Sequence, residues 1–150
     1  MSGPRLVLRA DASHRLGSGH VLRLAALAEA ALEAGGTATM VIGDEPAPSL
    51  AGLAARGLTA VAVDAPSGSD AERDATVALA RSLRADAVIV DGPTFTAAYT
   101  DAVGAAGLRA VALDDSGVAP PPTPVVVNHN LGAEALAERY PSAAVRLLGR

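Results

Sequence analysis

Short apolar stretches rich in valine and leucine alternate along the chain with longer stretches in which apolar residues recur every three or four positions. The first pattern is typical of β-strands and the second of amphipathic helices. We predict strands at residues 5–10, 37–42, 58–63, 87–90, 108–113, 124–127 and 143–148. Helices are predicted at residues 19–34, 49–56, from 69 or 70 to about 84, 96–106 and 133–139.

This alternation predicts an α/β fold: a three-layer, Rossmann-like, mostly parallel sheet with helices on both faces. The strand at 87–90 reads Ala-Val-Ile-Val, and an apolar run of this kind suits a sheet that is covered on both sides. A chain of 150 residues suits a single domain, residues 1–150. Three prolines at 120–122 predict a stiff linker.

The helix at 19–34 is expected to bury one apolar face. Its glycines at 35 and 36 are typical of a helix C-cap. Helical spacing assigns five residues to the buried face: Leu22, Ala25, Ala26, Ala28 and Leu32.

Composition excludes several functions. The chain has no cysteine, which rules out disulfides, thiolate catalysis and cysteine metal sites. It has no lysine, which rules out a P-loop. Its twelve arginines are scattered, the net charge is -4 and aromatic residues are few, so a nucleic-acid interface is not expected. No apolar run approaches membrane-spanning length, and a cytoplasmic protein is predicted.

Polar residues collect where the predicted strands end, and ligands of open parallel sheets bind outside those carboxyl ends. The first strand is followed by Asp11, Ser13, His14, Gly17, Gly19 and His20. Later strands are followed by Asp91, by Asp114 and Asp115, and by Asn128, His129 and Asn130.

Several of these features have a structural interpretation as well. The glycines of the first loop do not complete the dinucleotide fingerprint, and Gly43 separates the second strand from Asp44, so a dinucleotide site is disfavoured. Asp114-Asp115 could bind Mg²⁺ or cap the following turn. Residues 128–130 could be an asparagine-rich turn, and His14 suits a solvated loop.

His20 is the strongest candidate for proton transfer. It is predicted in the first turn of a helix, where unpaired N–H groups and the helix dipole favour anions. Histidine is the side chain whose ordinary pKa, about 6.5, lies nearest neutrality. Arg23 follows one turn later on the same face.

The pattern Arg9-x-Asp11-Ala12-Ser13-x-x-x-Gly17-x-Gly19-His20-x-x-Arg23 resembles the start of the nucleotide-sugar hydrolases of pseudaminic acid biosynthesis. Those enzymes act on a UDP-linked diacetamido-trideoxy-altropyranose and share the two-domain glycosyltransferase-B architecture. Later matches follow in the family's order: Val90-Asp91, Leu113-Asp114-Asp115, Val126 to Asn130, and Leu147-Leu148-Gly149. The resemblance covers the whole chain but only the family's N-terminal half.

The resemblance implies a UDP-sugar hydrolase in which His20 is the general base that activates water. It implies Asp11 as a second catalytic residue that orients the ring or contacts the sugar. It also implies substrate contacts from Arg9, Ser13, Gly17, Gly19, Arg23, Asp91, Asp114 and Asn128. The implied scheme uses no metal and no cofactor, and its partner is the UDP-sugar rather than nucleic acid or membrane.

Two departures from the family matter. Pro93 stands where the family has a tyrosine, so the sugar can differ. The family's nucleotide-binding C-terminal domain is not in these 150 residues, so the chain is expected to be an excised domain or a short protein whose cleft a partner completes. The alternatives are an acceptor-side domain of a glycosyltransferase and a non-catalytic sugar-binding or partner module.

Overall fold

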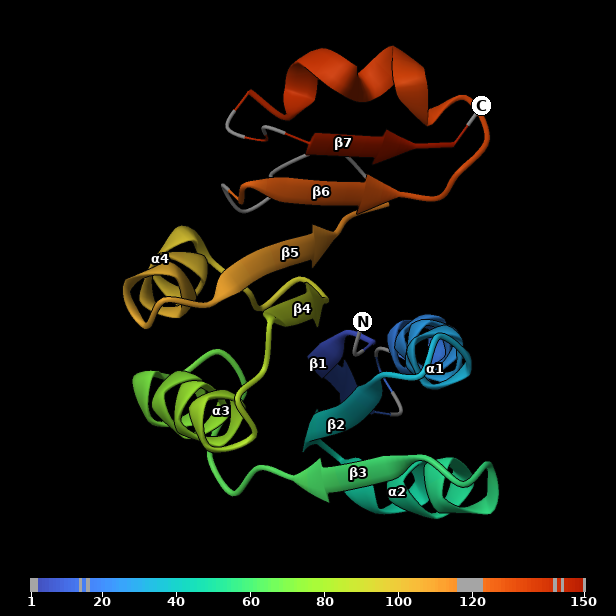
Figure 1. The fold of residues 1–150 in the computed structure, drawn as a ribbon, viewed down its shortest axis with the longest axis vertical. Coiled ribbons are helices and arrows are strands. Elements are labelled where there is room, and N and C mark those ends of the chain that lie inside the picture. Colours follow the sequence, from blue (N-terminus) through green and yellow to red (C-terminus); the bar gives the residue numbers. More distant parts are fainter. Residues whose placement is uncertain are drawn as a thin grey trace.

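The sheet is parallel throughout the part of the chain that the computed structural model describes, which is residues 3–13, 15, 17–115, 123–141, 143 and 145–149. Its order is β3-β2-β1-β4-β5-β6-β7 (Figure 1). The strands are β1 (Arg5–Ala12), β2 (Thr37–Asp44), β3 (Thr59–Ala62), β4 (Ala87–Asp91), β5 (Arg109–Leu113), β6 (Val125–Asn128) and β7 (Val145–Leu148). The chain runs outward from β1 to β3 and returns to β4 on the other side of β1, so the switch point lies between β1 and β4.

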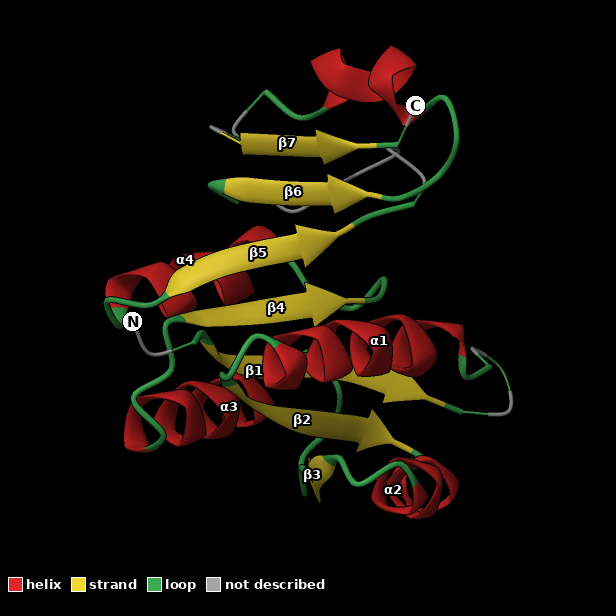
Figure 2. Cartoon of the chain, turned by 45° about the vertical axis from the view of Figure 1, so that its right-hand side comes forward, coloured by secondary structure: helices red, strands yellow, loops and turns green. Residues whose placement is uncertain are grey.

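Helices cover both faces of the sheet (Figures 1 and 2). The helices α1 (Gly19–Glu33) and α2 (Pro46–Ala55) lie on one face, and α3 (Asp70–Ser82) and α4 (Ala97–Ala105) lie on the other. The segment η1 (Ala133–Arg139), predicted as a helix, is a 3-10 helix that packs near β7. The predicted three-layer Rossmann-like fold is confirmed. None of the helices in the described ranges is long and apolar enough to cross a membrane.

Some predicted boundaries were wrong. The helix expected at 49–56 begins at Pro46, because proline in the first helical turn sets the backbone angle that a helix needs. The strand β1 continues to Ala12, where it pairs with Asp44. The predicted linker at 120–122 and His14 lie outside the described residues.

The buried face of α1 also differs from the prediction. The buried residues are Val21, Leu24, Ala25, Ala28 and Ala31. Leu22 is 51% exposed, Leu32 is 43% exposed and Ala26 is exposed. A helix this rich in alanine has apolar residues on every side, so its pattern defines the buried face poorly. The observed rotation brings His20 and Arg23 to the margin of the buried stripe, beside the sheet.

Alternation along β1 places Arg9 and Asp11 on the face covered by α3 and α4. The guanidinium of Arg9 is fully buried; its Nε donates to Oε1 of Glu72 over 2.8 Å, and its Nη1 lies 2.7 Å from Oδ1 of Asp11. The Tyr99 hydroxyl also donates to Oε1 of Glu72. Burial and the Glu72 carboxylate raise the pKa of Tyr99, which therefore stays a donor. These groups form one buried network, in which Oδ1 of Asp11 has an ion-pair contact with Arg9 but no hydrogen bond.

Asp11 also anchors two crossover loops at the carboxyl edge. Its Oδ2 accepts hydrogen bonds from Ser67, which follows β3, and from Oγ1 of Thr94, which follows β4. A buried carboxylate with these partners holds the loops against the sheet. Asp11 thus connects β1 to the segments that follow β3 and β4.

Gly43 makes room for this buried ion pair, because it pairs with Asp11 across β1 and β2. A Cβ at position 43 would overlap Nη2 of Arg9 and lie 2.7 Å from Oδ1 of Asp11. We predict that Gly43→Ala lowers the free energy of unfolding by roughly 1–3 kcal/mol, the usual cost of overpacking a core. Urea denaturation measures the change.

The matched control is Gly52→Ala, since a Cβ at position 52 in α2 meets no heavy atom within 4 Å. It should leave the free energy of unfolding unchanged or raise it by about 0.5–1 kcal/mol. Equal stabilities for the two variants would contradict this account of Gly43.

Candidate functional site

A histidine and a buried carboxylate meet at the switch point of the sheet. His20 lies in the first turn of α1, and Asp91 is the last residue of β4. The Nδ1 of His20 is 2.7 Å from Oδ1 of Asp91. Asp91 pairs with Ala10 in the sheet, and Ala10 packs in the core cluster on the α1 face. Paired residues of neighbouring strands point the same way, so the register directs Asp91 toward α1.

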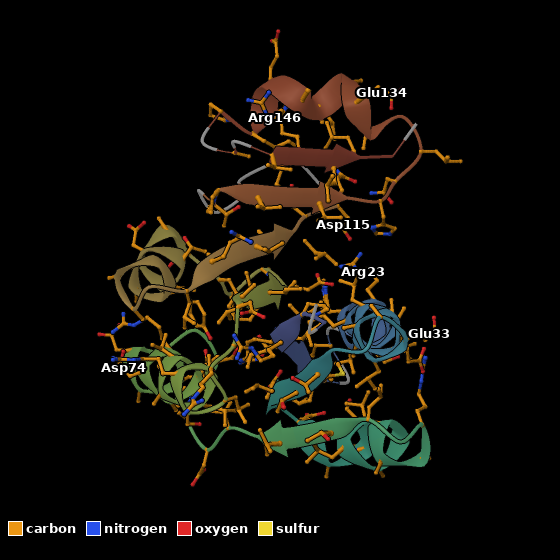
Figure 3. All side chains as sticks on the ribbon, viewed as in Figure 1. Arg23, Glu33, Asp74, Asp115, Glu134 and Arg146 are labelled. Atoms are coloured by element: carbon orange, nitrogen blue, oxygen red, sulfur yellow. The ribbon has the colours of Figure 1, made fainter. Side chains whose placement is uncertain are left out.

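Arg23 binds the same carboxylate from the next turn of α1. Its Nε donates to Oδ2 of Asp91 over 2.8 Å and its Nη2 donates to Oδ1 over 2.7 Å, a two-point ion pair. Its Nη1 donates to Oδ2 of Asp115, just after β5, over 2.8 Å. Figure 3 shows Arg23 extending from α1 toward Asp115. Hydrogen bonding to Asp91 raises the pKa of Arg23, and Arg23 lowers the pKa of Asp115, so this guanidinium joins two acidic groups.

Two groups bear on the ring proton of His20, because each lies 2.7 Å from Nδ1. Oδ1 of Asp91 can only accept a hydrogen bond and favours a hydrogen on Nδ1, whereas Nη2 of Arg23 can only donate and favours a lone pair there. When Nδ1 carries the hydrogen, the Nε2 atom of the neutral ring holds the lone pair. The His20 side chain is 20% exposed whereas Asp91 is only 2% exposed. A histidine ring that is oriented in this way by a buried carboxylate can serve as a general base.

A groove adjoins the first turn of α1. It has a volume of about 290 Å³ and is lined by Ala12, Ser13, Gly17, Ser18, Glu45, Pro48 and Ser49. A second hollow of about 230 Å³ shares three of these residues and continues between α1 and α2, where Leu22 and Leu53 contribute apolar walls. Apolar surface predominates in both hollows, and more strongly in the one between the helices.

The structure brings together some of the predicted site residues. His20, Arg23 and Asp91 form one hydrogen-bonded cluster. Ser13 and Gly17 line the groove, and Gly19 begins α1. The Ser18 side chain makes no cap hydrogen bond.

Two predicted roles are corrected by strand alternation. Asp11 was expected to orient His20, but it faces the opposite side of the sheet, and Asp91 occupies that position on the ring. Arg9 was expected to contact substrate, but it is fully buried against Glu72 and Asp11.

Three further residues predicted to contact substrate have protein partners in the structure, and their contacts with a sugar remain predictions. Asp91 is buried and its two oxygens bind His20 and Arg23. Asn128 is fully buried: its Nδ2 donates to the Tyr140 hydroxyl and its Oδ1 accepts from the backbone of Asn130. Asp114 accepts from the Tyr140 hydroxyl over 2.9 Å.

Sequence reasoning missed Asp115 as a partner of Arg23. Its position beside Asp114 was visible, but not which of the two carboxylates would reach α1. It also missed Glu72. The apolar periodicity places this residue on a helix, but nothing in the sequence indicates that its side chain is buried. Within the described ranges, no three histidine, aspartate or glutamate side chains are grouped as a metal ion would require.

Comparison with known proteins shows the fold. No family model and no curated protein matches the chain. MurG of Acinetobacter baumannii is similar over 97% of this chain and 45% of its own, with a TM-score of 0.65 and 13% identity. The spinosyn rhamnosyltransferase SpnG is similar over 83% of this chain and 44% of its own, with a TM-score of 0.52 and 17% identity.

This chain therefore spans less than half the length of either protein. The fold agrees with the expected N-terminal half of a glycosyltransferase-B fold. The narrower resemblance to the hydrolase family remains a prediction.

Two glycines of the first loop should respond differently to alanine. Gly17 has a φ of 72°, which strains any residue with a side chain, whereas a Cβ on Gly19 meets open space. We predict that Gly17→Ala lowers the free energy of unfolding by about 1–2 kcal/mol and that Gly19→Ala does not lower it. Thermal denaturation compares the two, and a destabilised Gly19→Ala variant would contradict the open geometry at that position.

Proposed function

We propose that this chain is the sugar-binding lobe of a nucleotide-sugar hydrolase that cleaves a UDP-linked amino or acetamido deoxysugar to UDP and free sugar. The observation that carries the proposal is the His20 ring held by Asp91 at the switch point of the sheet. Ligands of open parallel sheets bind at that place. The fold similarity to two glycosyltransferases supports a substrate of the nucleotide-sugar class.

The chemistry follows from the ring orientation. Nε2 of His20 takes a proton from a water molecule while the water oxygen attacks the anomeric carbon. The bond between that carbon and the diphosphate oxygen breaks, and its electron pair leaves with UDP. Asp91 stabilises the imidazolium that forms, because its Oδ1 lies 2.7 Å from Nδ1, which carries a hydrogen in that form. Positioned proton transfer of this kind is worth roughly 10²–10⁴-fold in rate.

The groove beside α1 supplies the proposed sugar site. Ser13 offers a hydroxyl there, and Gly17 and Gly19 expose backbone to a ligand. The first-turn N–H groups of α1, which the Ser18 side chain does not cap, suit an anionic group of the substrate. A nucleotide-binding lobe, in the same protein or a partner, would complete the cleft.

The alternative is an acceptor-side domain of a glycosyltransferase. The two similar structures favour it, since one is named a rhamnosyltransferase. In that case His20 removes a proton from a sugar hydroxyl instead of from water. The third candidate is a non-catalytic sugar-binding or partner module.

Replacing His20 tests the mechanism. We predict that His20→Asn lowers the rate of UDP release by at least about 10²-fold, because asparagine cannot accept the proton, while the fold and sugar binding stay nearly intact. UDP release by the full-length protein, circular dichroism and calorimetry with the free amino sugar give the three readouts. His14→Ala is the control and should have a mild effect. A wild-type rate for His20→Asn would exclude this mechanism.

An acceptor assay separates the two enzymatic candidates. The hydrolase should release UDP at the same rate with and without an added sugar acceptor. A glycosyltransferase should release UDP faster when the acceptor is present and should form a glycoside. Binding of free amino sugar without any UDP release, with or without acceptor, would favour the non-catalytic module.

A further inference from the structure

Charged groups from three elements surround the ring of His20 among the described residues. Asp91 contributes a carboxylate from β4, and Arg23 contributes a guanidinium from α1. Asp115, which follows β5, forms an ion pair with Arg23 and interacts electrostatically with the ring. The ring therefore lies beside a nearly buried ion pair, and its protonation depends on the balance of these charges.

The three closest atoms form a nearly equilateral triangle. Nδ1 of His20, Oδ1 of Asp91 and Nη2 of Arg23 are each 2.7 Å from the other two. A guanidinium has only donors, so Nη2 donates to Oδ1, and it lies equally close to Nδ1, to which it can donate only if that nitrogen holds a lone pair. A positive charge on Arg23 therefore sits at hydrogen-bond distance from the imidazole, on the same carboxylate.

These contacts have opposite effects on the ring. An ionised carboxylate at this distance stabilises the doubly protonated imidazolium, whereas a cation at the same distance destabilises it. An imidazolium carries a hydrogen on Nε2 and cannot take a proton from water. A dyad of histidine and buried aspartate alone would tend to hold that second proton.

We propose that Arg23 is the positioning residue that keeps His20 neutral, by neutralising Asp91 and repelling a second proton from the ring. Its contact with Asp115 holds the guanidinium in that position. The aspartate can then orient the ring through Nδ1 without converting it to the imidazolium. The consequence for catalysis rests on the proposed function, but the effect on the ring does not.

The test is an NMR titration of the His20 ring, which needs no substrate. The chain has three histidines, and the signal lost in His20→Asn identifies the ring. In Arg23→Gln the titration midpoint of that ring should move to higher pH than in the native chain, by roughly one to three pH units. In Arg23→Lys, which keeps the charge, it should move less. An unchanged midpoint in Arg23→Gln would overturn the proposal.

Arg5→Gln is the matched control. Arg5 pairs with Asp86 across β1 and β4 at the opposite edge of the sheet, so its loss should leave the His20 midpoint where it is. If Arg23→Gln does not fold, Asp91→Asn gives the reciprocal test. With the carboxylate gone and Arg23 still beside the ring, the midpoint should fall below the native value, and an unchanged or higher midpoint would overturn the proposal.

UDP release separates this inference from the proposed function. If the native protein releases UDP, the acidic limb of the pH–rate profile of Arg23→Gln should move upward with the midpoint, and activity should recover at high pH. If the native protein releases none but the midpoint still moves, the proposed function fails and the role of Arg23 stands. If UDP is released and the midpoint does not move, only the role of Arg23 fails.

Discussion

The alternation of side chains along β1 and β4, fixed by their parallel register, is the constraint on which this site depends. Because Ala10 pairs with Asp91 and packs toward α1, the Asp91 carboxylate points to the same side. Arg9 and Asp11 point to the other side, into the core beneath α3 and α4. The carboxyl edge of the sheet thus carries two separate polar clusters, one on each face. The cluster toward α1 contains the partly exposed imidazole, and the other holds crossover loops in place.

Burial of Asp91 gives the α1 cluster its chemical character. A carboxylate that is 2% exposed needs partners, and here it has a guanidinium on both oxygens and an imidazole on one of them. The imidazole gains a fixed orientation from this contact, while Arg23 balances the charge. Arg23 also binds Asp115. The cluster therefore connects the carboxyl ends of β4 and β5 to the first turns of α1. Nearby, the groove lined by Ser13 and Gly17 provides space for a ligand.

Sequence pattern predicted the fold class, the order of elements and the edge of the sheet where polar residues gather, because these follow from strand and helix periodicity and from where loops fall. It placed His20 and Arg23 correctly in the first turns of α1. It did not identify Asp91 as the partner of His20, because this choice depends on the register between β1 and β4, which pairs residues 81 positions apart. Leu22 and Leu32 were assigned to the wrong face for a related reason: in a helix rich in alanine, packing against the sheet decides which side is buried. Glu72 and Asn128, both fully buried, are polar residues whose burial is explained only by the partners that the fold supplies.

The central claim is that Asp91 holds the His20 ring with the hydrogen on Nδ1 and the lone pair on Nε2. A long-range proton–nitrogen NMR correlation of the neutral ring distinguishes the two tautomers directly. The account predicts a hydrogen on Nδ1 in the native chain and loss of that preference in Asp91→Asn. A native ring with its hydrogen on Nε2 would contradict the account, because Nε2 could not then act as a base.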